Sequence, residues 1–236
     1  MGHFVEVPSR DGQAFQAWLE EPADATGPRP GIVLLAEAYN VNDWARDEAA
    51  RYARHGFTVL APDLYWRIDP LQFMPYTPES QARARSIYSR LDFDRATDDC
   101  GACIDFLRQR PGANGRVGVV GFCIGGKLAL LAGAREAPDA AVGFYSIDLE
   151  PHFREVPAIA CPSMFHFGAL DTRVPVAYEQ HIREHSTPGQ DIALHIYPET
   201  GHGFARRGQP PYHEPSATLA TDRTLALFGR ALREPA

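Results

Sequence analysis

The sequence predicts an α/β domain in which a mostly parallel β-sheet carries helices on both faces. Two patterns predict it: short apolar runs alternate with stretches of helical spacing, and the chain opens with a hairpin signal. The 236 residues contain no internal repeat and no linker-like stretch. We therefore expect a single domain over residues 1–236, with a sheet of about eight strands.

The first two apolar runs, residues 4–7 and 13–20, flank the sequence Ser-Arg-Asp-Gly at residues 9–12. An Asp-Gly pair between two such runs favours a tight turn. The sheet is therefore expected to begin with an antiparallel hairpin.

The later strands and helices alternate along the chain. Apolar runs of strand length predict six further strands, at residues 31–35, 57–61, 116–120, 141–145, 163–167 and 192–197. Helical spacing of apolar residues predicts helices at residues 41–54, 79–108, 126–135, 176–184 and 216–232. Residues 22–30 and 208–215 are predicted as surface loops.

Composition narrows the classes of function. The chain carries a net charge of −7 with no separate basic block, which argues against binding to nucleic acid or to an anionic membrane. Its start lacks the apolar core of a signal peptide, and its most apolar stretch, residues 117–132, is interrupted by glycines and by Lys127. We expect a soluble cytoplasmic protein that acts on a small molecule.

Two short motifs suggest metal or redox chemistry but have simpler explanations. Cys100 and Cys103 form C-x-x-C inside a predicted helix behind two aspartates, which favours a packed helix face over a redox pair or zinc site. His181 to His185 reads H-x-x-E-H, and we expect a solvated helix end there. In a reducing cytosol all the cysteines are expected to be thiols.

The strongest motif is Val-Val-Gly-Phe-Cys-Ile-Gly-Gly at residues 119–126, where a buried strand leads through G-x-C-x-G into a helix. This pattern is typical of a nucleophile elbow, in which glycines flank the nucleophile because the turn leaves no room for side chains. Cys123 would lie at the helix N-terminus, which favours thiolate, and the N–H of Ile124 would be an oxyanion donor. The alternative is a buried structural cysteine.

The same residues also fit a phosphate-binding loop, since residues 121–127 read G-x-x-x-x-G-K. That motif needs Ser or Thr after its lysine to hold magnesium, whereas Leu128 follows Lys127 here. A nucleotide-binding protein using this loop is therefore the weaker hypothesis.

Two residues on loops after later predicted strands are candidate partners of Cys123. Asp171 follows the strand at 163–167, and His202 follows the strand at 192–197. The order nucleophile, acid, histidine is that of the α/β-hydrolases, in which the histidine transfers protons and the acid orients it. Taken singly, Asp171 also fits a helix cap and His202 a loop histidine.

Glu37 lies in Ala-Glu-Ala-Tyr-Asn, directly after the strand at 31–35. With this loop, the Asp-Gly turn, Ala-Pro-Asp-Leu-Tyr at residues 61–65, the cysteine elbow, Asp171 and Gly-His-Gly-Phe-Ala-Arg at residues 201–206, the chain resembles the dienelactone hydrolases, also called carboxymethylenebutenolidases. The resemblance covers nearly the whole chain. Cysteine rather than serine in the elbow is its most specific part.

The resemblance implies an α/β-hydrolase fold and a Cys–His–Asp triad of Cys123, His202 and Asp171. It implies an enzyme that opens the lactone ring of dienelactone to maleylacetate in chloroaromatic catabolism, without metal or other cofactor. It gives the second oxyanion donor to the N–H of Ala38, and it gives Glu37 the task of taking the thiol proton. A capping or salt-bridged glutamate is the alternative for Glu37.

The resemblance also implies two arginines that hold the substrate carboxylate. Arg206 matches one, but the position of the other is occupied by Gln81, with Arg83 and Arg85 nearby as replacements or as a solvated helix face. Asn40 stands where the family has a glycine. Three tyrosines match aromatic positions of the family's pocket: Tyr39, Tyr88 and Tyr145.

The leading hypothesis is thus a monomeric cytoplasmic hydrolase that acts on a small anionic lactone through a thioester intermediate. A broader carboxylesterase or thioesterase of the same fold is the alternative within the hydrolases. A nucleotide-binding protein and a noncatalytic binding module with an inactive elbow are the alternatives outside that class.

Overall fold

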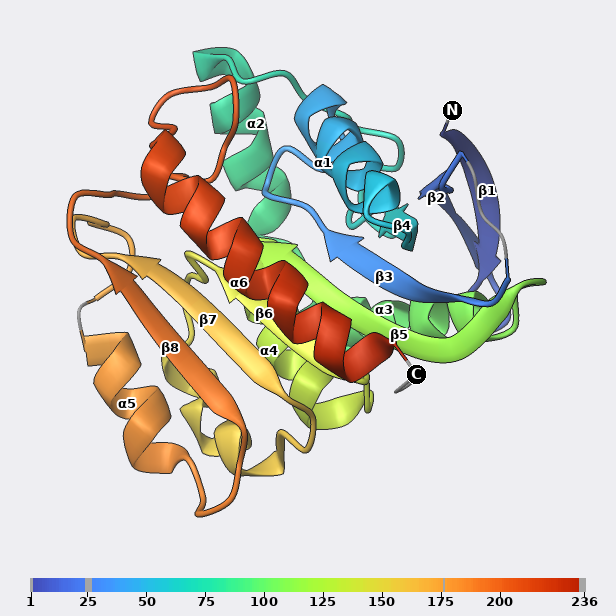
Figure 1. The fold of residues 1–236 in the computed structure, drawn as a ribbon. Coiled ribbons are helices and arrows are strands. Elements are labelled where there is room, and N and C mark those ends of the chain that lie inside the picture. Colours follow the sequence, from blue (N-terminus) through green and yellow to red (C-terminus); the bar gives the residue numbers. More distant parts are fainter. Residues whose placement is uncertain (1, 24–26, 176, 234–236) are drawn as a thin grey trace.

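The strands form one eight-stranded sheet in the order β1-β2-β4-β3-β5-β6-β7-β8 (Figure 1). The computed structural model describes residues 2–23, 27–175 and 177–233. The strands are β1 His3–Pro8, β2 Ala14–Glu20, β3 Arg29–Leu35, β4 Thr58–Pro62, β5 Ala113–Phe122, β6 Ala140–Phe144, β7 Ser163–Gly168 and β8 Ile192–Tyr197. Strand β2 pairs antiparallel with β1 and with β4, whereas all other pairs are parallel. The predicted α/β fold with an antiparallel N-terminal hairpin is confirmed.

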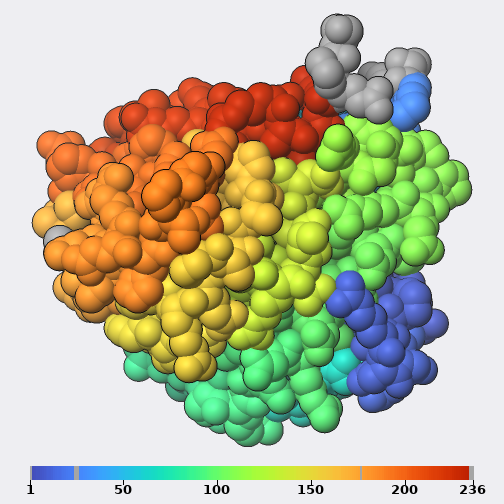
Figure 2. All heavy atoms as spheres, turned by 90° about the horizontal axis from the view of Figure 1, so that it is seen from below, coloured from blue at the N-terminus to red at the C-terminus, as the bar shows by residue number. Residues whose placement is uncertain are grey.

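Helices cover both faces of the sheet (Figure 1). They are α1 Asp43–Arg54, α2 Pro78–Tyr88, α3 Phe93–Arg108, α4 Ile124–Arg135, α5 Ala177–His185 and α6 Glu214–Leu232. Helices α1 and α6 pack on one face, and α3 and α4 pack on the other. The strands β4, β6 and β7 are buried along their whole length, as expected for parallel strands covered on both sides. Figure 2 shows the blue hairpin at one end of the molecule and the orange β8–α5 region at the other.

The structure differs from the sequence prediction at several boundaries. The helical stretch predicted at 79–108 is two helices, because the Asp92 side chain accepts the N–H groups of Asp94 and Arg95 and so starts α3 anew. A 3₁₀ helix at Glu150–Ala158 was not predicted. Strand β3 begins inside the predicted loop 22–30, since the N–H of Arg29 bonds to the carbonyl of Gly112. Residue 176, where a helix was predicted to begin, lies outside the described residues.

The topology brings four loops to the carboxyl edge of the sheet, where open α/β folds place their sites. Strands β3 and β5 are parallel neighbours, with Leu35 opposite Gly121, so the segments that follow them emerge side by side. Strands β7 and β8 are likewise neighbours, with Gly168 opposite Tyr197. Among the described residues, no helix has the length and apolar character needed to cross a membrane.

Candidate active site

Cys123 lies at the sharp turn between β5 and α4, with φ 58° and ψ −113°. A positive φ is costly for a residue with a side chain, so the surrounding packing must hold it in place. A Cβ on Gly121 would overlap the carbonyl of Gly125, and one on Gly125 would overlap the carbonyl of Leu35. The glycines of the motif are therefore required by close backbone contacts, as the elbow hypothesis predicts.

The backbone around Cys123 offers donors for a developing negative charge. Ile124 is the first residue of α4, so its N–H has no acceptor within the helix. Ala38 follows β3 and lines the same cavity as Cys123. Its carbonyl accepts the hydroxyl of Tyr65 at 2.9 Å, which fixes the orientation of this loop.

His202 and Asp171 meet at the ends of β8 and β7. The Nδ1 atom of His202 lies 2.9 Å from Oδ2 of Asp171, whose side chain is fully buried. The other carboxylate oxygen accepts the N–H of Arg173 at 2.9 Å. The carboxylate is thus held from two sides, and it fixes the orientation of the imidazole.

The second ring nitrogen of His202, Nε2, is buried and makes no hydrogen bond of ordinary geometry. Burial lowers the pKa of His202, but the charge of Cys123 and the hydrogen bond to Asp171 outweigh burial and raise the pKa to about 10. His202 therefore takes up a proton readily when Cys123 is a thiolate.

Glu37 is buried beside this group and is held by three side chains. Its Oε1 atom accepts the hydroxyl of Tyr145 at 3.0 Å, and its Oε2 atom accepts the hydroxyl of Tyr76 at 2.9 Å. Arg206 donates from Nε at 2.9 Å and approaches through Nη2 at 2.8 Å, both to Oε2. Glu37 is thus not a helix cap but a salt-bridged glutamate at the centre of a buried cluster, as one of the alternative interpretations predicted.

One cavity of about 210 Å³ joins these groups. Cys123, His202, Glu37 and Ala38 line it, together with Gln81, Ala84 and Arg85 of α2. The remaining lining residues are Tyr39, Arg173, Arg206 and Pro211. Of the predicted triad, Cys123 and His202 therefore line the same cavity, and Asp171 is hydrogen-bonded to His202 outside it.

Only some of the predicted substrate-binding residues line the cavity. Tyr39, Arg85 and Arg206 line the cavity, whereas Arg83 does not: it points to the surface and pairs with Asp69 at 3.0 Å. Helical geometry explains this, because residues two apart lie on different faces of α2.

Two of the predicted tyrosines do not line the cavity either. Tyr88 donates its hydroxyl to Asp148. Tyr145 lies behind the cavity wall, where its hydroxyl holds Glu37 and its ring contacts His202 edge-on with centroids 5.1 Å apart. The expectation that these two tyrosines line the pocket is therefore corrected: Tyr145 supports Glu37 from outside the cavity, and the Tyr88 hydroxyl is bound to Asp148.

Two residues at the site were not predicted from the sequence. Arg173 lines the cavity two positions after Asp171, and its place in the loop that carries the acid was a usable signal. Tyr76 reaches Glu37 from the segment between β4 and α2. No motif marks Tyr76, because only the fold brings that segment next to Glu37.

The lysine of the possible phosphate-binding loop and the two cysteines of the C-x-x-C motif do not line this cavity. Lys127 is 5% exposed, and its Nζ atom lies 3.8 Å from the centre of the Phe93 ring, away from the candidate cavity. Cys100 and Cys103 are buried free thiols on α3. Across residues 2–23, 27–175 and 177–233, no group of three potential metal-ligating side chains gathers.

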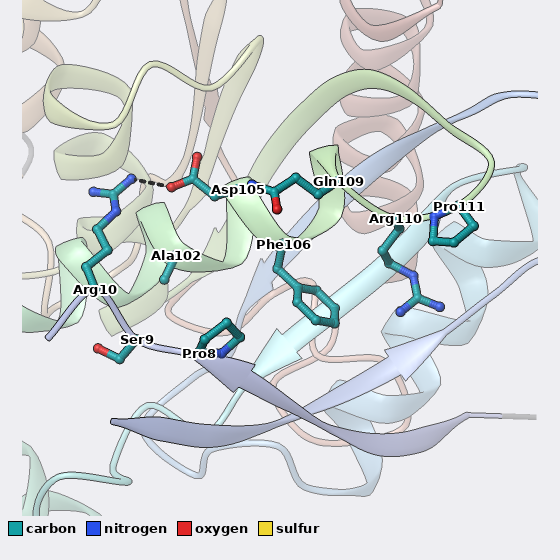
Figure 3. Close-up of a pocket in the computed structure, with 9 residues that line it drawn as sticks. All are labelled: Pro8, Ser9, Arg10, Ala102, Asp105, Phe106, Gln109, Arg110 and Pro111. Carbon is teal, nitrogen blue, oxygen red and sulfur yellow. Dashed lines mark hydrogen bonds and ion pairs between the residues drawn. The ribbon is translucent and has the colours of Figure 1, made fainter. Parts of the chain in front are cut away.

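A larger groove of about 440 Å³ lies between β1 and α3 and shares no lining residue with the cavity at Cys123 (Figure 3). Its charged side chains are already paired: Arg10 binds Asp105 and Glu136, and Arg110 binds Glu21. It contains no cysteine, histidine or other evident nucleophile beyond Ser9, whose hydroxyl bonds to Asp99. The smaller cavity at Cys123 is therefore the candidate active site.

Comparison with known proteins identifies the family of the chain. The model of the dienelactone hydrolase family matches residues 15–232. Carboxymethylenebutenolidase 1 of Cupriavidus pinatubonensis is 34% identical over 98% of this chain and 97% of its own. A carboxymethylenebutenolidase of Pseudomonas putida is 35% identical over 94% of this chain and 93% of its own.

Solved structures show the same fold at lower sequence identity. A Klebsiella pneumoniae protein superposes with a TM-score of 0.85 at 23% identity, covering 98% of both chains. The dienelactone hydrolase of Anabaena variabilis superposes with a TM-score of 0.72 at 20% identity, covering 99% of both chains. The family match and the relatives of about one-third identity show that this α/β-hydrolase chain belongs to the dienelactone hydrolase family.

Proposed function

We propose that this protein opens the lactone ring of dienelactone to maleylacetate, with Cys123 as nucleophile. The observation that carries the proposal is the meeting of Cys123, the His202–Asp171 pair and the Glu37–Arg206 pair around one small cavity. The relatives named carboxymethylenebutenolidase support the choice of lactone.

In the proposed reaction, the thiol proton of Cys123 passes to Glu37 once substrate displaces Glu37 from Arg206. The thiolate attacks the lactone carbonyl, and the N–H groups of Ile124 and Ala38 stabilise the oxyanion. The ring C–O bond then breaks, which leaves a thioester on Cys123 and expels the ring oxygen as an enolate. Water, deprotonated by His202 or by the enolate, hydrolyses the thioester and restores the thiol.

The charges around the cavity favour an anionic substrate. Arg206 forms an ion pair with Glu37, whereas Arg85 and Arg173 make no ion pair within the described part of the chain. Two uncompensated guanidinium groups at one cavity attract carboxylates, which they bind in a planar, bidentate manner. We propose that Arg85 and Arg173 replace the arginine that the family places at the position of Gln81.

The test is the rate of dienelactone ring opening, followed by loss of its ultraviolet absorbance, for the natural sequence and for Cys123→Ala. We expect rapid loss that the substitution abolishes. Unchanged turnover in Cys123→Ala would contradict the assigned nucleophile. A strong preference for neutral aryl esters over dienelactone would instead identify a broader carboxylesterase or thioesterase.

A further inference from the structure

The carboxylate of Glu37 accepts an uneven set of hydrogen bonds. Its Oε2 atom has three donor contacts: Tyr76 at 2.9 Å, Nε of Arg206 at 2.9 Å and Nη2 of Arg206 at 2.8 Å. Among the described residues, its Oε1 atom accepts one hydrogen bond, from the hydroxyl of Tyr145 at 3.0 Å. Because each carboxylate oxygen offers about two lone pairs, Oε2 is saturated in this arrangement.

Tyr76 contacts Glu37 from a segment that lines a neighbouring cleft. It does not line the 210 Å³ cavity but forms part of the wall of a separate cleft of about 520 Å³, with Phe73 and Gln209. The guanidinium carbon of Arg206 lies 4.5 Å from the centre of the Tyr76 ring, and the ring of Tyr39 packs on it at 4.5 Å. The hydroxyl of Tyr76 therefore touches Glu37 without lying where substrate binds.

The Tyr76 hydroxyl is a permanent donor. Burial and the charge of Glu37 raise the pKa of Tyr76 well above its ordinary value, and the nearby charge of Arg206 offsets this only in part. Tyr76 thus keeps its proton at neutral pH, and its hydroxyl can donate to the carboxylate.

We propose that Tyr76 is a positioning residue that keeps Glu37 paired with Arg206 and thereby withholds it from the thiol of Cys123 until substrate binds. The inference rests on the proposed role of Glu37 as the acceptor of the thiol proton. When a substrate carboxylate draws Arg206 away, Tyr76 and Tyr145 remain the donors that steady Glu37. Tyr76 would thus protect a reactive cysteine in the resting enzyme.

The proposal is tested by alkylation of Cys123 in the absence of any lactone. In that reaction the Cys123 S–H bond breaks, its proton goes to Glu37, and the thiolate forms a C–S bond with iodoacetamide as iodide leaves. Tyr76→Phe keeps the ring against Arg206 and Tyr39 but removes one donor from Oε2. We expect alkylation about tenfold faster, since a hydrogen bond to a charged group is lost.

The matched control is Tyr212→Phe, which removes a buried tyrosine hydroxyl that has no hydrogen-bond partner. Its alkylation rate is expected to equal that of the natural sequence. Rates are measured by mass spectrometry of the Cys123 peptide, so that reaction at the other cysteines is not counted. Near-ultraviolet circular dichroism shows whether each variant is folded.

A second pair of variants asks whether Tyr76 acts through Glu37. In a Glu37→Gln background the proton acceptor is gone, and adding Tyr76→Phe is expected to leave the alkylation rate unchanged. An unchanged or slower rate in Tyr76→Phe alone, or equal acceleration in the Glu37→Gln background, would overturn the proposal. Because no lactone is used, the result is independent of whether dienelactone proves to be the substrate.

Discussion

The ionisation of His202 is coupled to that of Cys123. Burial lowers the pKa of His202, but the charge of a Cys123 thiolate and the hydrogen bond to Asp171 outweigh burial and raise the pKa to about 10. The two partners act from opposite sides of the ring, since Asp171 holds Nδ1 and leaves Nε2 free of ordinary hydrogen bonds. The nucleophile and the base are therefore a coupled pair.

Replacing Cys123 by Ser is expected to lower the pKa of His202. A serine hydroxyl does not ionise, so the influence that a Cys123 thiolate exerts on the imidazolium cannot arise, while the burial that opposes the imidazolium remains. Titration of the His202 ring by NMR measures the change. Cys161→Ser, which alters a buried thiol that lies in no contact with His202, serves as the control. A pKa that stays near 10 would show that Asp171 alone determines it.

Arg85→Gln and Arg173→Gln are each expected to raise KM for dienelactone on the order of tenfold, because a charge-assisted contact to the carboxylate is lost. Turnover of a neutral aryl ester, which has no carboxylate to bind, is expected to change little. Arg83→Gln provides a control on the same helix, since Arg83 pairs with Asp69 outside the cavity. Equal losses on the neutral ester would point to a structural role instead.

At the scale of elements, the β5–α4 junction determines where the nucleophile lies. The turn is so tight that a Cβ atom on Gly121 or on Gly125 would overlap a backbone carbonyl. The strand also pairs with β3 and β6 on its two sides, so it has little freedom to move. This packing, rather than a local conformational preference, keeps Cys123 in its strained backbone conformation.

Gly121→Ala is expected to destabilise the protein by roughly 1–3 kcal/mol or more, because its Cβ overlaps a backbone carbonyl that cannot rotate away. Gly229→Ala in α6 is the matched control, since a Cβ there meets no atom. It is expected to be stabilising by about 1 kcal/mol through helix propensity. Urea unfolding measures both, and equal stability of the two variants would contradict this account of the elbow.

At the scale of the whole molecule, Arg67 connects the N-terminal hairpin to the rest of the structure. Its guanidinium binds Asp11 and Ser9 near the β1–β2 turn and Asp99 on α3. Asp99 also accepts the indole N–H of Trp66 at 2.8 Å. The hairpin at the edge of the sheet is thereby fastened to a helix that is distant in sequence.

The Arg67 guanidinium lowers the pKa of Asp11 from 3.8 to about 2. A carboxyl whose pKa is lowered by folding contributes stability above its unfolded pKa, and that contribution is lost as the pH falls through the folded value. Asp11→Asn is therefore expected to have a lower Tm than the natural sequence at pH 7, by a small margin at this exposed site. The difference in Tm is expected to shrink between about pH 4 and pH 2. A margin that persists at pH 2 would contradict the ionic origin.

Much of the fold was predictable because its signals are local. Apolar runs and helical spacing identified every strand of the sheet, and the turn chemistry identified the hairpin. The missed break between α2 and α3 depended on Asp92, whose capping role competes with a helical pattern that continues on both sides. Asp171 and His202 were found because each follows a recognisable strand, Cys123 because it stands in a G-x-C-x-G motif, and Glu37 through the resemblance to the dienelactone hydrolases.

What the sequence by itself determined is thus the order of the elements and the identity of the residues at the carboxyl edge of the sheet. Only the tertiary structure decided which side chains surround the cavity. Arg83 pairs with Asp69 outside it, Arg173 lines it, and Tyr76 donates a hydrogen bond to Glu37. The physical reason is that strand and elbow patterns arise from neighbours in the chain. The surroundings of a buried carboxylate depend on segments that meet only after the sheet has formed.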